Sequence, residues 1–243
     1  MAIIGRKFFT VGVIGAMKAE IDALKPRIEN CKTLTLSGIE FVYGDLFGMH
    51  VVAAVCGIGK VFAAICAEAM IVTFQPDVII NAGVGGSLTD KLEIGGAGIA
   101  TAVVQHDMDT TPLGDPKGLI SGINKVYFDC DKTCVELLEE AAEEHGINHA
   151  KGVIASGDCF VNSAAKRDEL RKEFSAIVCE MESGAIGHVC CVNDVPFGVL
   201  RTISDNGDES SHNDYSKSLA KAAVAELEIL ESFLEKLGAR HGN

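Results

Sequence analysis

Short runs rich in β-branched residues alternate with longer helix-like segments along most of this chain. We predict strands at residues 9–14, 41–46, 50–56, 78–82, 98–105, 152–156, 176–181 and 197–203. We predict helices at residues 18–29, 60–74, 132–145, 164–174, 183–193 and 216–237. Strands that are each followed by a helix favour parallel pairing under helical cover, so the pattern predicts an α/β fold. A run of three strands from about residue 33 to residue 56 adds antiparallel hairpins.

The chain is long enough for one large core and shows no linker. Of its 243 residues, 48% are hydrophobic and only five are Pro, with no Ser- and Gly-rich spacer. We therefore predict a single domain over residues 1–243. Its architecture should be a three-layer fold, with a mixed, largely parallel central sheet flanked by about six helices. No segment approaches the roughly 18 apolar residues of a membrane span.

Charge and cysteine usage restrict the partners and the compartment. The formal charge is −13, from 34 acidic and 21 basic residues, so a nucleic acid or an anionic membrane would be repelled. Nine Cys occur without a CxxC pair, and several lie in apolar runs. This usage predicts free thiols in a reducing compartment, and hence a cytoplasmic protein. The first residues carry a basic pair before a short apolar run, which we interpret as the first buried strand and not as a signal peptide.

Two carboxylates interrupt the apolar stretch "IVCEMESGAIGHVCC" at residues 177–191. Strand alternation places Glu180 and Glu182 on the same face. A buried carboxylate is costly unless it is paired, so each of these side chains needs a partner. Arg201 is a candidate partner for Glu180, whose role the sequence leaves open.

Other predicted strand ends also carry polar or flexible groups. "GVIGAMKAE" puts Glu20 in the first turn of a helix, and "RTISD" ends in Ser204 and Asp205. "NAGVGGSL" predicts a glycine-rich turn, and "SGDCFVNS" offers the ring of Phe160. Each has a structural alternative, such as a helix-dipole interaction, an ordinary turn or an ion pair. Because ligands bind at the carboxyl ends of strands in open α/β sheets, we expect these groups to converge. Converging carboxylates suit a transition state with positive charge on the substrate.

Three weaker motifs are set aside. Leu88 replaces the third Gly of a dinucleotide-binding GxGxxG, and "CGIGKV" lacks the first Gly and the Ser or Thr of a phosphate loop. His145 and His149 have helical spacing for a metal, but Gly146 interrupts the helix and no third ligand is evident. We therefore predict no metal and no cofactor.

Taken together, the motifs resemble the 5′-methylthioadenosine/S-adenosylhomocysteine nucleosidases of the nucleoside phosphorylase superfamily. The matching segments are "GVIGAMKAEI", "GIGKVFAA", "PDVIINAGVGGSL", "SGDCFVNS", "CEMESGAIGHVC" and "PFGVLRTISD", in family order. The resemblance implies hydrolysis of the N-glycosidic bond, which gives adenine and a thioribose. It also implies a homodimer acting on a small nucleoside and water in methionine salvage.

The resemblance implies three catalytic residues. Glu20 matches the base that activates water, and Glu182 matches the acid that grips the ribose hydroxyls. Asp205 matches the general acid at N7 of the purine. An ionised carboxylate cannot donate a proton, so Asp205 must be protonated when the bond breaks.

The resemblance also implies a substrate-binding set. Arg201 and Met181 match positions around the ribose and water, and Phe160 and Val161 match the adenine pocket. The remaining positions lie near the 5′-alkylthio group, in the glycine-rich segment or beside the general acid; they are Ile58, Tyr215, Val84, Gly85, Gly86 and Ser204. This chain departs from the family pattern at Lys18 and Ala19, where acidic residues are frequent, and at Val84, where Ser is frequent.

Other readings stay open at this point. A purine nucleoside phosphorylase would need a phosphate pocket, which Glu20 would repel. A futalosine-type nucleosidase shares the carboxylate chemistry, and a nucleoside sensor would not need the acid. The loop at residues 106–126 is long enough for a lid or for contact with a neighbouring subunit. The sequence does not rank methylthioadenosine, S-adenosylhomocysteine and 5′-deoxyadenosine.

Overall fold

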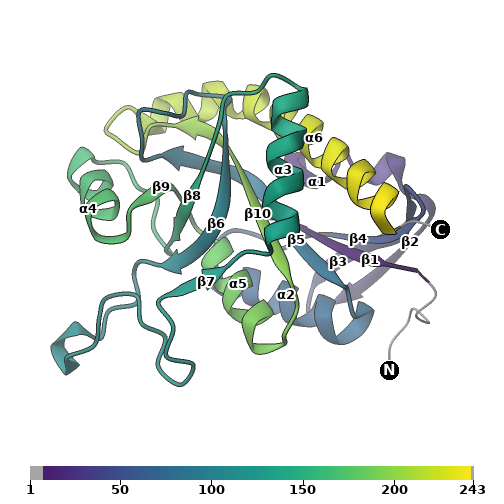
Figure 1. The fold of residues 1–243 in the computed structure, drawn as a ribbon, viewed down its shortest axis with the longest axis horizontal. Helices are drawn as coiled ribbons and strands as arrows, with labels where there is room; N and C mark the ends of the chain where they lie inside the picture. The colour runs from purple at the N-terminus through teal and green to yellow at the C-terminus, as the bar shows by residue number, and fades with distance from the viewer. Residues whose placement is uncertain (1–7, 242–243) are drawn as a thin grey trace.

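The computed structural model describes residues 8–241, except for the side chains of residues 19, 20, 212–214 and 216. One sheet runs through the described chain (Figure 1). Its strands are β1 (Thr10–Gly15), β2 (Glu29–Leu36), β3 (Ile39–Leu46), β4 (Met49–Val55), β5 (Val78–Ser87), β6 (Ala97–Gln105), β7 (Tyr127–Asp129), β8 (His149–Ser156), β9 (Ala176–Glu180) and β10 (Phe197–Asp205). Its helices are α1 (Lys18–Ile21), α2 (Lys60–Phe74), α3 (Lys132–Glu144), α4 (Ala164–Phe174), α5 (Ser183–Val192) and α6 (Ser211–His241), with short 3-10 turns at Lys25–Arg27 and Thr111–Leu113.

The sheet is mixed, as predicted. Strands β4, β1, β5 and β10 are parallel neighbours, while β2, β3 and β4 form antiparallel hairpins. Strand β10 continues to β6, then β8 and β9, and the end of β9 returns to the end of β5. Strands β5, β10, β6, β8 and β9 therefore close into a ring, which we call the β5 ring.

Helices cover both faces of the sheet and complete the predicted three layers. On one face, α2 and α5 pack against each other and contribute Met70, Phe74 and Ile186 to a shared core. On the other face, α3 and α6 contribute Leu137, Leu138 and Phe233 (Figure 1). None of the helices described here is long and apolar enough to cross a membrane.

The first predicted helix is much shorter in the structure. Residues 18–29 were predicted to be helical, but α1 ends at Ile21 and a 3-10 turn with Pro26 near its start leads into β2. A Pro in a helix interior lacks the N–H donor and clashes with the preceding turn. The last helix is longer than the predicted 216–237, and it buries Ile229, Leu230 and Phe233 against the sheet.

The glycine-rich segment predicted as a turn is instead part of a strand. Strand β5 continues through it to Ser87, because β10 pairs with it as far as Gly86 and β9 pairs with its last two residues. The prediction of a turn was wrong because these glycines serve close packing. A Cβ on Gly85 would lie 2.6 Å from Cγ1 of Val178.

The loop at residues 106–126 projects from the body between β6 and β7, as Figure 1 shows at the lower left. It contains the 3-10 turn and a bridge between Ile120 and Lys125. The short strand β7, which follows the loop, was not predicted; its three residues are too few to show an alternating pattern.

Candidate active site

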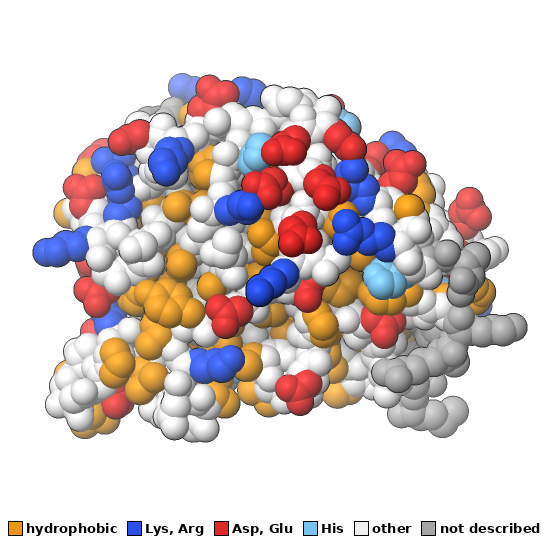
Figure 2. All heavy atoms as spheres, in the orientation of Figure 1, with side chains coloured by type: hydrophobic (Ala, Val, Ile, Leu, Met, Phe, Trp, Pro, Cys, Tyr) orange, Lys and Arg blue, Asp and Glu red, His pale blue; other side chains and the backbone are white. Residues whose placement is uncertain are grey.

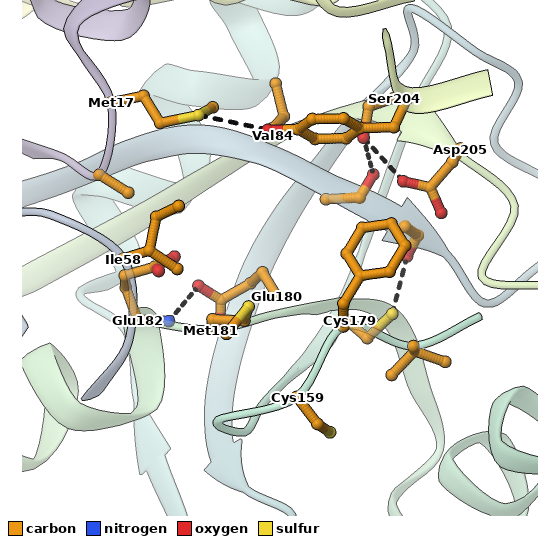
Figure 3. Close-up of a pocket in the computed structure, with 16 residues that line it drawn as sticks. Met17, Ile58, Val84, Cys159, Cys179, Glu180, Met181, Glu182, Ser204 and Asp205 are labelled. Atoms are coloured by element: carbon orange, nitrogen blue, oxygen red, sulfur yellow. Dashed lines mark hydrogen bonds between the residues drawn. The ribbon is translucent and has the colours of Figure 1, made fainter. Parts of the chain in front are cut away.

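A cavity of about 320 Å³ lies where β5, β9 and β10 end (Figure 3). The segment after β1, the loop after β8, the turn before α2 and the first part of α6 complete its wall. The residues that line it and that we predicted from the sequence are Ile58, Val84, Gly85, Gly86, Phe160, Val161, Met181, Glu182, Ser204, Asp205 and Tyr215. The structure therefore brings together residues separated by most of the chain around one space.

A β-bulge directs two adjacent side chains toward this cavity. The register between β10 and β5 shifts after Ile203, so Asp205 and not Ser204 is paired with Gly86. In a regular strand, neighbouring side chains point to opposite faces, yet both Ser204 and Asp205 line the cavity. A bulge inserts one residue and redirects the strand end, and such bulges are frequent next to active sites.

Asp205 is buried and held by hydrogen bonds at both oxygens. The backbone N–H of Gly207 donates to Oδ1 at 2.9 Å, and the Ser204 hydroxyl donates to Oδ2 at 2.9 Å. A Cβ on Gly86 would lie 2.9 Å from Oδ1 of Asp205. Glycine at this position therefore leaves the space that the carboxyl group occupies.

Glu180 organises the start of α5 and pairs with Arg201. Its Oε2 accepts hydrogen bonds from the backbone N–H groups of Glu182 at 2.9 Å and Ser183 at 2.8 Å. Its Oε1 accepts from the hydroxyls of Ser183 and Ser156. Glu180 thus satisfies free N–H groups at the start of this helix.

Arg201 completes this buried network. Its Nη2 lies 2.6 Å from Oε2 of Glu180 and donates to Oδ1 of Asn81. Burial alone would raise the pKa of the Glu180 carboxyl, but the Arg201 guanidinium and the surrounding donors outweigh it and hold that pKa below its usual range. Arg201 is 1% exposed and does not line the cavity, so it acts from behind the carboxylates.

Glu182, like Glu180, lines the cavity. The backbone N–H of Gly59 donates to its Oε1 at 2.9 Å, and Nη2 of Arg201 lies 3.8 Å from its Oε2. Glu182 is only 6% exposed, so a cation or a set of hydroxyls in the cavity would meet it in a weakly solvated environment. Figure 3 shows Glu182 beside Ile58 on one side of the cavity, with Asp205 on the other.

Two aromatic rings border the rest of the cavity. Phe160 is 46% exposed, and its ring meets that of Tyr215 edge to face at a centroid distance of 5.9 Å. The Tyr215 hydroxyl donates to the sulfur of Met17 at 3.2 Å, and so joins α6 to the segment after β1 (Figure 3). The walls between these rings are mostly apolar, as is usual for a site that binds a small molecule.

Glu20 lies in α1, directly after the strand whose following residues, Ala16 and Met17, line the cavity. Its side chain is outside the described part of the structure. The sequence reasoning did not single out Ala16, Met17, Cys159 or Cys179, which also line the cavity. Ala16 and Met17 could have been found, because they follow the end of a predicted strand; the two cysteines resemble ordinary core residues.

The two histidines that we set aside as metal ligands do not belong to one group of possible donors in the described structure. His149, without His145, lies close to Glu139 and Glu143 in a group of possible donors between α3 and β8. Glu139 is already paired with Lys151 at 2.6 Å, and none of these residues lines the cavity.

Comparison with known proteins places this architecture in a family. The sequence model of the phosphorylase superfamily matches residues 10–235, which include every described residue that lines the cavity. The chain belongs to the phosphorylase superfamily. The solved structures that resemble the chain include nucleosidases and a futalosine hydrolase.

Two of these structures are 5′-methylthioadenosine/S-adenosylhomocysteine nucleosidases. The enzyme from Neisseria meningitidis, in complex with methylthio-immucillin-A, is 34% identical, with a TM-score of 0.90, and the match covers 93% of this chain and 99% of that one. The enzyme from Helicobacter pylori is 32% identical, with a TM-score of 0.90 and coverage of 94% and 99%. A futalosine hydrolase from Helicobacter pylori is similar to the same degree, at 32% identity, a TM-score of 0.91 and coverage of 96% and 100%.

Proposed function

We propose that this protein hydrolyses the N-glycosidic bond of 5′-methylthioadenosine and S-adenosylhomocysteine, releasing adenine and the thioribose. The observation that carries the proposal is the placement of Asp205 and Glu182 around one nucleoside-sized cavity with Phe160. The similarity to solved nucleosidases supports the same reaction. The protein acts in this proposal as an N-glycosidic hydrolase without a cofactor.

Each carboxylate has a separate task in the proposed reaction. Asp205, in its protonated form, donates to N7 of the purine, so that adenine leaves as a neutral molecule. The sugar then carries positive charge, which Glu182 stabilises while it accepts hydrogen bonds from the ribose hydroxyls. Glu20 takes a proton from the water that attacks the sugar. Phe160 stacks on the base, and Val161 binds its edge through the backbone.

The charge in the cavity favours water over phosphate as the nucleophile. Among the described residues that line it, none is Lys or Arg, whereas Glu180, Glu182 and Asp205 are present. A phosphate ion would be repelled by these carboxylates and would find no cationic partner there. The purine nucleoside phosphorylase reading therefore has no support from the described site.

A futalosine-type nucleosidase is the second candidate, because a futalosine hydrolase is among the similar solved structures. Both reactions would use the same carboxylates, so the group at the 5′ position decides between them. Ile58, Met17 and Tyr215 give this chain a mainly apolar surface beyond Glu182, which suits an alkylthio tail.

One assay separates these readings. We expect purified protein to release adenine from methylthioadenosine and S-adenosylhomocysteine at the same rate with and without added phosphate. Release that depends on phosphate would instead indicate a phosphorylase. Faster release of hypoxanthine from futalosine would favour the second candidate, and binding without release would indicate a sensor.

We propose a cytoplasmic location and a role in methionine salvage, since removal of methylthioadenosine returns its sulfur-bearing sugar to metabolism. All nine cysteines are free thiols, and six are buried. Unpaired cysteines are typical of a reducing compartment.

We also propose that the protein forms a homodimer through α2 and α5. On α2, Val61 is 69% and Phe62 is 53% exposed, and on α5, Val192 is 58% exposed. Figure 2 shows hydrophobic side chains gathered in the lower half of the molecule, below the charged surface over α3. Grouped apolar side chains of this kind are frequent at protein interfaces.

Replacing Val192 by Asp should shift the protein from dimer to monomer, because it places a charge on the apolar face. Sedimentation velocity of wild type and variant measures the change. The exposed Val224 on α6, replaced by Asp, is the control and should leave the dimer intact. A wild-type protein that sediments as a monomer at micromolar concentration would contradict the proposed dimer.

A further inference from the structure

We propose that Lys60, Asp107 and Asp158 form a clamp that positions the adenine-binding loop relative to Glu182. The adenine-binding loop is residues 157–163, between β8 and α4. None of the three clamp residues lines the cavity of the candidate active site. The proposal rests on the proposed function, since it assigns positioning residues to that reaction.

The clamp begins at the first turn of α2. The Asp158 carboxylate accepts a hydrogen bond from the backbone N–H of Lys60 at 2.8 Å. One residue earlier, the N–H of Gly59 donates to Glu182 at 2.9 Å. Two carboxylates therefore bind adjacent free N–H groups at one helix N-terminus, where the helix dipole also favours negative charge. One of them comes from the adenine-binding loop, and the other lies at the proposed ribose position.

Asp107, which follows the end of β6, also binds the adenine-binding loop. Its Oδ2 accepts a hydrogen bond from the backbone N–H of Asp158 at 3.0 Å, and its Oδ1 lies 2.6 Å from Nζ of Lys60. Lys60 also reaches Oε1 of Gln105 at 3.4 Å. Burial raises the pKa of Asp107, but the hydrogen bonds from Lys60 and Asp158 and the Lys60 charge outweigh it, so that this pKa is lowered. The side chains of Lys60 and Asp107 are 19% and 30% exposed, so water screens the pair only in part.

Apolar contacts also hold the loop, since Val161 is buried and the ring of Phe160 meets that of Tyr215. The polar contacts are few: the N–H of Gly157 donates to the carbonyl oxygen of Glu180 at 3.1 Å, and Asp158 binds α2 and Asp107. Cys159 adds a sulfur-to-nitrogen contact of 4.0 Å with His106. The three residues that follow Asp158, namely Cys159, Phe160 and Val161, all line the cavity. Asp158 therefore supplies the side-chain hydrogen bond that links these three residues to the helix N-terminus that also binds Glu182.

Asp107→Ala should raise KM for methylthioadenosine about tenfold, because a hydrogen bond to a charged group is lost and the loop is released. The kcat should change by less than threefold, since no reacting group is moved. Asp107→Asn keeps an acceptor for the Asp158 N–H and should raise KM only about threefold. The KM of Lys60→Met should lie between the KM values of these two variants. Lys151→Met removes an ion pair of the same 2.6 Å length with Glu139, far from the cavity, and should leave both constants unchanged.

Hydrogen–deuterium exchange of residues 157–163 tests the clamp without the reaction. In Asp107→Ala, exchange in this loop should rise at least fivefold, while exchange in β5 and the melting temperature stay close to wild type. Wild-type protein that releases no base from any nucleoside would contradict the proposed function but leave this exchange test intact. Unchanged loop exchange in Asp107→Ala, or equal KM values for the Ala and Asn variants, would overturn the clamp. A fall in kcat with unchanged KM would also overturn it.

Discussion

Replacing Asp205 by Asn should lower the rate of adenine release by about 10²–10⁴-fold, the usual contribution of a general acid. Asn has the same shape as Asp but cannot transfer a proton to the purine. The buried position at the end of β10 can accept it, because an amide oxygen can take the Gly207 N–H and its nitrogen can donate to the Ser204 oxygen. Substrate affinity should therefore fall far less than the rate.

Single-turnover adenine release and calorimetric binding of methylthioadenosine measure the two quantities separately. Ser204→Ala is the matched control, because it removes a hydroxyl from the Asp205 carboxyl and leaves the carboxyl in place. We expect this variant to lose about tenfold in rate, the value of one hydrogen bond to a charged group. An Asn variant that keeps a third or more of the wild-type rate would show that the leaving group takes its proton elsewhere.

Replacing Arg201 by Met should lower the free energy of unfolding by about 3–5 kcal/mol. The Arg201 and Glu180 side chains are 1% and 2% exposed, so removing the guanidinium leaves a negative charge buried without its cation. Glu182, whose Oε2 lies 3.8 Å from the same guanidinium, should also lose its orientation, and adenine release should slow. Urea unfolding at neutral pH measures the change in stability.

The double variant Arg201→Met, Glu180→Gln provides the test of this pairing. It removes both charges, so its loss of stability should be clearly smaller than the sum of the two single losses. Additive losses would mean that the pair does not interact energetically. The folded-state pKa of Glu180 is lowered below the ordinary value of 4.5, so its contribution is present above that pH and is lost as the pH falls through the lower folded value. Wild-type stability should therefore decline in this acid range more steeply than that of Glu180→Gln.

The fold and most of the cavity could be predicted from local sequence patterns. Helices α2 and α4 begin and end at the predicted residues; α2 follows Gly59, and α4 follows Ser163, whose hydroxyl caps it. Residues at strand ends, such as Asp205, could be assigned to one edge of the sheet because the carboxyl ends of parallel strands lie at the same edge. The predicted first helix was too long. The apolar residues around Pro26 have helical spacing, but Pro26 lacks the N–H donor that a helix interior needs.

Most contacts that orient the site could not be predicted, because they depend on pairs distant in sequence. Arg201 was a candidate partner for Glu180 and the structure confirms this pair, but no local pattern joins Glu180 to Ser156. The bulge at Ser204 has no sequence signal either, since it arises from the register against Gly85 and Gly86. Likewise, Asp107 and Lys60 are ordinary charged residues until the fold brings them to 2.6 Å.

The closure of the β5 ring restricts which parts of the protein can move during turnover. Each strand of the ring is hydrogen-bonded on both sides, so the walls that carry Glu182 and Asp205 cannot spread apart to admit a nucleoside. Entry and departure must therefore occur at the rim, through segments such as residues 157–163. Substitutions at the rim can therefore change how long adenine stays bound, while the residues that break the bond keep their positions in the rigid wall.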